Sequence, residues 1–254
     1  MRLGFLGTGE ITAALVRGLQ GQGHQVLVSP RNATVAAALA AEVKGVSVVP
    51  NEEVVRGSDV VFLCLLARVA RDLLPSLPFR AGQTVISVMV DAPLADLRQL
   101  CAPATDIAIT IPLPPIATGG CPLPVYPASP VLEALFGTRN LILPQPSEAA
   151  LNAHLGASAL CSPILDQLLT ATEWLADHTG NPAAAEAYIA AMIRGYLPER
   201  AAEGDLAEAL KKLSTEGGLN ATLRAAMAPA KEALRQGLDG FHSRLGLNDP
   251  KGRT

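Results

Sequence analysis

The chain has 254 residues, enough for one large domain or two ordinary domains with a substantial core. A net charge of −3 gives no electrostatic footprint for nucleic acid, and no segment is long and apolar enough to span a membrane. With 49% hydrophobic but only 4% aromatic residues, the sequence predicts a soluble protein packed with small aliphatic side chains, with room for a large subunit interface.

The N-terminal apolar run is too short for a signal peptide, so we expect a cytoplasmic location. The four cysteines, at positions 64, 101, 121 and 161, are far apart, and the four histidines are equally scattered. The sequence therefore predicts no metal site, and it predicts packed thiols in a reducing compartment.

The first element joins a short apolar strand, residues 3–6, to a helical pattern through a turn with Gly7 and Gly9. Gly7 permits a tight exit from the strand, and the missing side chain at Gly9 lets the backbone approach a pyrophosphate at the helix N-terminus. Thr12 stands where a third small residue is expected. The predicted phosphate-binding residues are Gly7, Thr8, Gly9, Glu10 and Ile11. An ordinary glycine-containing turn is the alternative.

Strands and helices then alternate along the chain. Apolar runs predict strands at residues 25–28, 46–49, 59–65, 84–88 and 106–111. Helical patterns between them cover residues 33–44, 51–55, 68–74 and 94–100. This alternation implies right-handed crossovers, and hence an N-terminal Rossmann-type α/β domain with a doubly wound parallel sheet.

The pattern becomes irregular after residue 111. The proline-rich residues 112–115 cannot form a helix, because the proline rings remove donors and restrict the preceding residues. Further strands are expected at residues 123–126 and 140–143, with a helix at 131–136 between them, and the sheet is expected to end near Pro146.

The rest of the chain is helical in pattern. We expect a helix over residues 147–178 with a kink at Pro163, then helices over 183–196, 205–213 and 219–238, the last irregular near Pro229. Their wide alanine and leucine faces carry more apolar surface than one isolated layer can cover. The sequence therefore predicts a C-terminal all-α dimerisation domain.

The residues after the second strand indicate which dinucleotide the first domain binds. An acidic residue here would bond the ribose of NAD, but this chain has Ser29, Arg31 and Asn32. Ser29 and Asn32 can donate to phosphate oxygens, and the guanidinium of Arg31 can donate two charge-assisted hydrogen bonds that suit phosphate geometry. NADP is therefore favoured over NAD. The alternative makes Arg31 a solvated charge and Ser29 a simple turn residue.

Several segments match the motifs of one known family. They are Gly-Phe-Leu-Gly-Thr-Gly at residues 4–9 with Ala-Leu at 14–15 and Arg-Gly at 17–18, the turn at 29–32, Ser-Asp-Val-Val-Phe-Leu at 58–63, Val-Ile-Ser at 85–87 and, more weakly, Glu-Gly-Gly at 216–218. With them, the chain resembles the pyrroline-5-carboxylate reductases, strongly over the first ninety residues and thinly beyond.

This resemblance implies an NADPH domain, with Leu65 and Leu66 at the cofactor, and a helical dimerisation domain. It also implies hydride transfer to a cyclic C=N bond of a small-molecule substrate, in a cleft between the two domains. The expected organisation is an NADP-binding domain at residues 1–146, a helical dimerisation and substrate domain at 147–247, and a polar tail at 248–254.

The substrate motifs depart from the family pattern. Leu66-Ala67 replaces Lys-Pro, and residues 111–115 lack the Asn and Thr that face the family's active site. The Ser-Gly-Ser-Gly-Pro-Ala turn appears only as residues 155–160. The Pro-Gly-Gly-Thr-Thr segment is Glu-Gly-Gly-Leu-Asn at residues 216–220. We therefore expect an imine or carbonyl reductase with an altered substrate pocket.

Four residues are candidates for the cleft. Asn220 is a candidate hydrogen-bond donor, Glu216 a proton source or iminium partner, and Ser158 and His154 are polar residues on the first long helix. Each has a plainer alternative. Glu216 can be a charge favoured at a helix N-terminus, Asn220 a capping or surface residue, and His154 an exposed helical residue.

Two further functions remain open at this point. The altered motifs also suit a non-catalytic or regulatory NADP-binding homodimer. A reductase that passes hydride between NADP and a deazaflavin is a third possibility, which rests on the fold of the first domain alone.

Overall fold

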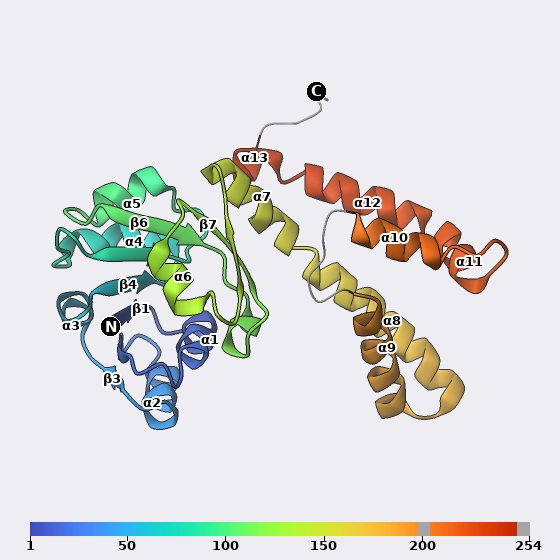
Figure 1. Cartoon of the computed structure of the whole chain (residues 1–254), viewed down its shortest axis with the longest axis horizontal. Helices are drawn as coiled ribbons and strands as arrows, with labels where there is room; N and C mark the ends of the chain where they lie inside the picture. The colour runs from blue at the N-terminus through green and yellow to red at the C-terminus, as the bar shows by residue number, and fades with distance from the viewer. Residues whose placement is uncertain (198–203, 248–254) are drawn as a thin grey trace. The chain divides into compact units, whose positions relative to one another are not determined.

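The computed structural model describes residues 1–197 and 204–247, in two compact units, Met1–His154 and Leu155–Thr254 (Figure 1). The first unit contains a sheet and the helices that cover it, and the second contains helices. Helix α7 (Glu148–Ser158) runs through the junction between the units. The domain boundary expected after residue 146 stays a prediction, and the polar tail expected at 248–254 lies outside the described residues.

One eight-stranded sheet forms the centre of the first unit. Its strands are β1 (Arg2–Leu6), β2 (Gln25–Val28), β3 (Val46–Val48), β4 (Val60–Leu63), β5 (Thr84–Ser87), β6 (Asp106–Thr110), β7 (Pro122–Tyr126) and β8 (Leu141–Pro144). Their spatial order is β3-β2-β1-β4-β5-β6-β7-β8, and β1 to β6 are parallel. The first six strands thus have the doubly wound Rossmann order, which confirms the predicted fold class.

The last two strands differ from the all-parallel expectation. β7 runs antiparallel to β6, and β8 is parallel to β7. A crossover to a parallel neighbour needs a dozen or more residues and usually a helix. The connection at residues 111–121 contains only a 3₁₀ turn, η2 (Pro114–Ala117), so β7 returns antiparallel. This turn corrects the expectation that residues 112–115 are non-helical, because prolines fit the first positions of a turn where no N–H is needed.

Helices cover both faces of the sheet. Two apolar clusters show the division: α1 (Glu10–Gly18), α2 (Ala33–Glu42) and α6 (Pro130–Phe136) pack on one face, and α3 (Asn51–Gly57), α4 (Ala67–Leu73), η1 (Leu74–Ser76) and α5 (Leu94–Leu100) on the other. Phe62 of β4 stacks on Phe5 with ring centroids 4.7 Å apart and meets Phe136 of α6 edge-on. Its neighbour Val61 belongs to the opposite cluster, so β4 is buried on both faces.

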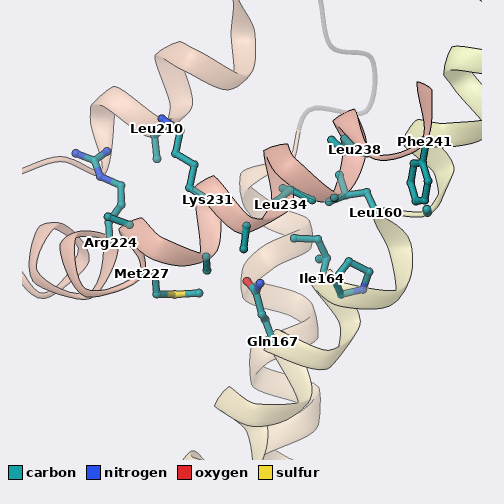
Figure 2. A pocket seen from close by; sticks show the side chains of 16 residues that line it. Leu160, Ile164, Gln167, Leu210, Arg224, Met227, Lys231, Leu234, Leu238 and Phe241 are labelled. Atoms are coloured by element: carbon teal, nitrogen blue, oxygen red, sulfur yellow. The ribbon is translucent and has the colours of Figure 1, made fainter. Parts of the chain in front are cut away.

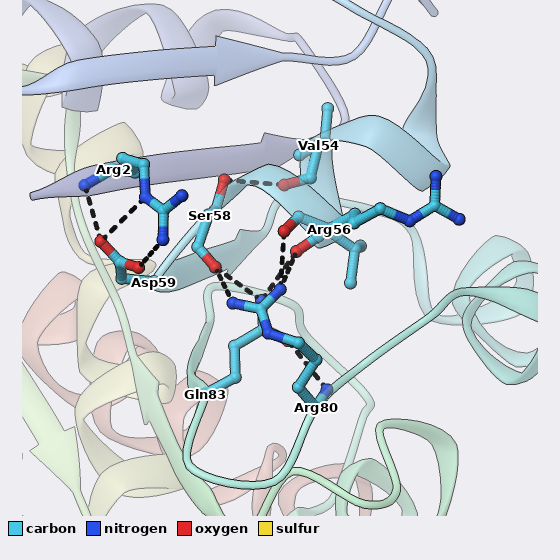
Figure 3. A network of polar contacts seen from close by, with 8 residues as sticks. Arg2, Val54, Arg56, Ser58, Asp59, Arg80 and Gln83 are labelled. Carbon is cyan, nitrogen blue, oxygen red and sulfur yellow. Dashed lines mark hydrogen bonds and ion pairs between the residues drawn. The ribbon is translucent and has the colours of Figure 1, made fainter.

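Polar side chains hold the amino-terminal edge of the sheet (Figure 3). The guanidinium of Arg80 donates to the carbonyl of Ser58 at 2.8 Å and to two carbonyls at the end of α3. The amide of Gln83 also donates to the Ser58 carbonyl, at 2.9 Å. Arg2 pairs with Asp59 at 2.6 Å just before β4. Arg80 and the Arg2–Asp59 pair are therefore occupied in fixing the backbone where β4 begins.

The second unit is a series of helices. They are α8 (Cys161–Thr179), α9 (Pro182–Tyr196), α10 (Asp205–Lys212), α11 (Leu219–Ala226), α12 (Ala228–Asp239) and α13 (His242–Leu245). Helices α8 and α9 form a hairpin through Gly180, which adopts a left-handed conformation, and Asn181, which caps α9.

Two predicted helices are each interrupted. The helix expected over residues 147–178 breaks between Ser158 and Cys161, not at Pro163. A proline clashes with the carbonyl four residues earlier, and in the first turn of a new helix it needs no N–H partner. The break therefore lies upstream of Pro163, which falls in the first turn of α8. The helix expected over 219–238 is interrupted at Met227, two residues before Pro229.

The helical unit buries little of its apolar surface by itself. Within the described part of the chain, α8, α10, α11, α12 and α13 contain no buried residue. Within residues 155–197 and 204–247, the buried residues are Gly156 of α7 and Ala185 and Ile189 of α9. Among the described residues, no helix combines the length and apolarity needed to cross a bilayer.

Candidate functional site

The strand order has a topological switch point at β1. β1 lies between β2 and β4, so the chain leaves the carboxyl ends of β1 and β4 toward helices on opposite faces. Such a reversal of strand order is where open α/β sheets bind ligands. Gly7 follows β1, and Cys64 follows β4 with its amide bonded to the Leu6 carbonyl at 2.8 Å. The glycine turn predicted from the sequence therefore lies at this switch point.

Position 7 accommodates only glycine without strain. Its φ is +89°, a conformation that residues with a Cβ rarely adopt, and a Cβ here would collide with the backbone oxygen of Cys64. The Gly7 amide donates to the Ser29 hydroxyl at 2.8 Å, and its carbonyl accepts from the Thr12 hydroxyl at 2.6 Å. Three neighbouring segments thus fix the turn in one conformation.

Ser29 and Thr8 face inward in this structure. Ser29 is buried, and its hydroxyl accepts the hydrogen bond from Gly7. The Thr8 hydroxyl donates to the Ser29 carbonyl at 2.5 Å. Both residues tie the end of β2 to the glycine turn, a role that sequence reasoning missed. Their expected contact with a cofactor phosphate stays a prediction.

Gly9 leaves open space at the start of α1. It is the N-cap residue, it brings no capping side chain, and a Cβ placed on it would meet no atom within 4 Å. The first backbone N–H groups of a helix have no partner within the helix, and the helix dipole favours an anion there. Glu10 is exposed and Ile11 is half-buried in the same turn. Backbone N–H groups beside an unfilled space are the features that a phosphate needs.

Arg31 provides a cation beyond the end of β2. It is exposed, and within the part of the chain that the structure describes it has no ion-pair partner. Asn32 caps α2, with its side-chain oxygen accepting from the Val35 amide at 3.3 Å, and its amide hydrogens remain available as donors. The charge expected for a 2′-phosphate is therefore present at this edge, whereas Arg2 and Arg80 at the amino-terminal edge are hydrogen-bonded within the protein.

The loops after β4 and β5 complete this edge. Leu65 is buried, whereas Leu66 is 56% exposed at the start of α4. After β5, Val90 is 43% exposed, and Asp91 adopts a φ of +61°. Sequence reasoning missed Val90 and Asp91. Their position a few residues after a buried strand, in a run that ends at Pro93, was the available signal.

The four candidate residues of the predicted cleft have local partners or open surroundings. His154 is exposed on α7, with Nδ1 2.9 Å from the Ala150 carbonyl. The Ser158 hydroxyl donates to the Leu155 carbonyl at 2.7 Å. Glu216 lies in an exposed turn, and Asn220 is exposed in the first turn of α11. No hydrogen bond or ion pair among these four is observed in the described residues, and their catalytic roles stay predictions.

A groove lies within the helical unit (Figure 2). It has a volume of about 1000 Å³ and is lined mainly by apolar side chains, among them Ile164 of α8, Leu210 of α10, and Leu234 and Leu238 of α12. None of the four candidate catalytic residues lines it. Figure 2 shows Ile164 and Leu234 projecting toward each other from α8 and α12.

The cysteines differ sharply in accessibility, which gives a testable prediction. Burial raises the pKa of the Cys64 thiol to about 12, although a hydrogen bond with Thr12 lowers it in part, and burial raises that of Cys101 to about 12. Burial also raises the pKa of Cys121, whereas Cys161 is exposed. Because the thiolate is the reactive form, a disulfide reagent at pH 8 should label one thiol rapidly and three only after unfolding. Cys161→Ser should remove the fast phase. Fast labelling of Cys101 or Cys121, which are buried, or of the half-buried Cys64 with its raised pKa would contradict this expectation.

Comparison with known proteins supports the architecture. A sequence model of the family described as "NADP oxidoreductase coenzyme F420-dependent" matches residues 2–91, a stretch that includes the glycine turn. No curated protein matches the chain in sequence. The matched stretch covers the first five strands, and it does not reach the helical unit.

Solved structures are similar over almost the whole chain. A pyrroline carboxylate reductase of Plasmodium falciparum with NADP bound is 13% identical, with a TM-score of 0.80 over 96% of this chain and 97% of that chain. A pyrroline-5-carboxylate reductase of Coxiella burnetii is 16% identical, with a TM-score of 0.75 over 96% and 97%. An imine reductase of a Pseudomonas species is 17% identical, with a TM-score of 0.65 over 96% and 92%. The resemblance predicted from the sequence is thereby confirmed as a likeness of fold.

Proposed function

We propose that this protein is an NADPH-dependent reductase that transfers hydride to a C=N bond or a related C=O bond. The observation that carries the proposal is the glycine turn at the β1–β4 switch point, which hydrogen bonds hold in one conformation. Open space lies at Gly9, and the exposed cation of Arg31 lies at the same edge. The similar Plasmodium falciparum reductase has NADP bound, and a reductase from Aspergillus terreus was solved with NADPH. Both relatives support the choice of cofactor.

The residues at the switch point fit a dinucleotide phosphate. The first N–H groups of α1 would receive the pyrophosphate across the space that a side chain at Gly9 would fill, and Arg31 and Asn32 would receive the 2′-phosphate. Leu65 and Leu66 would lie against the apolar parts of the cofactor. When bound, NADPH supplies the hydride, and the protein supplies binding, orientation and exclusion of water.

The proton required by the reduction needs a donor. Glu216, Asn220, Ser158 and His154 remain our candidates for donating a proton or hydrogen bond to the substrate. The carboxylate at Glu216, where the family carries proline, would disfavour an anionic imine. We therefore propose that the substrate differs from pyrroline-5-carboxylate.

Arg31 tests the choice between NADPH and NADH. Arg31→Ala should raise the Kd of NADPH about 30-fold, because charge-assisted hydrogen bonds to phosphate contribute about 2 kcal/mol, while the Kd of NADH stays nearly unchanged. Titration of the nicotinamide fluorescence measures both values. Arg56→Ala is the matched control, since Arg56 is also exposed but lies at the end of α3, which leads into the amino end of β4. An equal loss for both cofactors, or no loss, would contradict the proposed 2′-phosphate site.

We also infer that the helical unit forms a homodimer. Leu165 and Leu169, one turn apart on the same side of α8, are 63% and 55% exposed in the single chain. Exposed apolar side chains that lie side by side mark protein interfaces in soluble proteins. A second copy of the same chain would bury matching faces of both helical units.

Cofactor consumption separates the proposed function from its alternatives. The assay follows NADPH oxidation with a panel of cyclic imines, keto acids and aldehydes, and with coenzyme F420 as a deazaflavin acceptor. Oxidation with imines or carbonyl compounds supports the reductase, and oxidation with F420 alone supports the deazaflavin alternative, in line with the name of the matched family. A protein that binds NADPH but oxidises none would be the non-catalytic dimer.

A further inference from the structure

A row of loop residues crosses the carboxyl edge of the sheet beside the glycine turn. Leu6 is paired in register with Leu63, and Leu63 with Ser87. Gly9, Leu66 and Val90 each lie three residues beyond one member of this row. The β5 loop is further tied to β4, because the Val88 amide bonds to the Leu63 carbonyl at 3.0 Å. Along this edge, the glycine turn after β1 is thus succeeded by one aliphatic side chain in the loop after β4 and one in the loop after β5.

Both aliphatic side chains are exposed, although the strands that precede them are buried. Leu66 is 56% and Val90 is 43% exposed, whereas the strand residues that precede them, Leu63 and Ser87, are fully buried. Leucine and valine gain free energy when an apolar ligand covers them. Their exposure at the edge where a cofactor's reactive end would be expected favours an apolar ligand in contact with them.

The charges of these loops argue against an anionic ligand. Residues 64–67 after β4, 88–93 after β5 and 111–117 after β6 contain no lysine or arginine. Asp91, the one charged residue among them, is acidic. A carboxylate brought against Leu66 and Val90 would lose its hydration without gaining a cation from these loops, which is costly. The nearest cation along the chain is Arg68, exposed on α4.

We propose that Leu66 and Val90 form an apolar rim that determines specificity, so that the substrate is an imine or carbonyl compound without a carboxylate. This inference rests on the proposed reductase function and specifies its substrate class. Val90 would contact the substrate and not the phosphates, because it lies two strands away from β1. Substitutions of Val90 should therefore change substrate specificity without changing cofactor binding.

The test compares 1-pyrroline with 1-pyrroline-5-carboxylate, which differ only in the carboxylate. The wild-type kcat/KM should be at least about tenfold higher for 1-pyrroline, the order of discrimination that an apolar pocket provides. Val90→Lys should lower this ratio at least about tenfold by adding a cation, and Val90→Thr should lower kcat/KM for 1-pyrroline with a smaller change in the ratio. Val48→Lys is the control, since Val48 is a 40% exposed valine at the outermost strand β3, and Arg68→Ala should leave the ratio unchanged.

The outcomes separate this inference from the proposed function. Faster reduction of 1-pyrroline-5-carboxylate, especially if Arg68→Ala abolishes the preference, would overturn the apolar rim and leave the reductase function standing. The same ratio in Val90→Lys as in the wild type, with an unaltered KM for NADPH showing a folded protein, would also overturn it. A protein that binds NADPH but oxidises it with none of the cyclic imines, keto acids and aldehydes would refute the proposed function. It would also refute the substrate specificity assigned to the apolar rim.

Discussion

Replacing Gly9 by valine should weaken NADPH binding at least about 100-fold, equivalent to about 2.7 kcal/mol, while the protein stays folded. Gly9 has a φ of −115° and a ψ of −165°, an extended conformation that valine readily adopts, and a Cβ there meets no protein atom within 4 Å. The valine side chain would instead fill the space in front of the first N–H groups of α1. The loss of stability should stay near 1 kcal/mol, the usual cost of a poor N-cap residue. Fluorescence titration and urea unfolding measure the two effects.

Gly7→Ala provides the contrasting variant in the same turn. A Cβ at Gly7 collides with the Cys64 carbonyl, and the backbone lies in the left-handed region at a φ of +89°. We expect a loss of about 2–4 kcal/mol in the free energy of unfolding, because strain and steric overlap add. Gly9→Val thus separates ligand binding from stability, whereas Gly7→Ala affects both. Normal NADPH binding by Gly9→Val would show that the cofactor does not approach α1.

The second large effect concerns the helical unit. Leu165→Glu on α8 should convert a dimer of twice the 26.3 kDa chain mass into a monomer, raising the dissociation constant at least about 100-fold. A charge placed in an apolar interface is desolvated without a partner, which costs several kcal/mol. Light scattering after size-exclusion chromatography measures the mass.

Thr170→Glu is the matched control on the same helix. Thr170 is exposed, and helical spacing places it on the side of α8 opposite the stripe of Leu165, Leu168 and Leu169. It adds the same charge to the face that a partner would not cover. A wild-type chain that is monomeric at micromolar concentration, or equal dissociation of both variants, would contradict a dimer formed through this stripe.

Local sequence signals predicted the first unit well. The glycine turn, the apolar runs and the helical spacing between them are short-range patterns, and they were sufficient for a Rossmann-type doubly wound parallel sheet because right-handed crossovers leave few alternatives. The antiparallel β7 was missed because its direction depends on the length of the preceding connection. Proline signals were shifted by a few residues: the break expected at Pro163 occurs before Cys161.

The site was predictable in outline but not in its contacts. Glycines at a strand-to-helix turn report backbone geometry directly, so Gly7 and Gly9 could be located from the sequence. Ser29 was chosen as a phosphate donor, but its hydroxyl faces inward to Gly7, a contact between segments 22 residues apart. Val90 and Asp91 carry no motif, and only the pairing of β1 with β4 and of β4 with β5 places their loop at the same edge of the sheet as the turn. Contacts between distant segments depend on the packed structure, which periodicity does not encode.

The most direct test of the proposed reductase function follows hydride from cofactor to product. NADPH deuterated at the transferring position of C4 is incubated with the protein and 1-pyrroline, and the product is analysed by mass spectrometry. The proposed function predicts a saturated amine that carries one deuterium on the carbon of the former C=N bond. With NADPH well below its Kd for the variant, Gly9→Val should form this product at least about 100-fold more slowly. NADPH that binds tightly in a Gly9-dependent manner but remains unoxidised with imines, keto acids and aldehydes alike would contradict it.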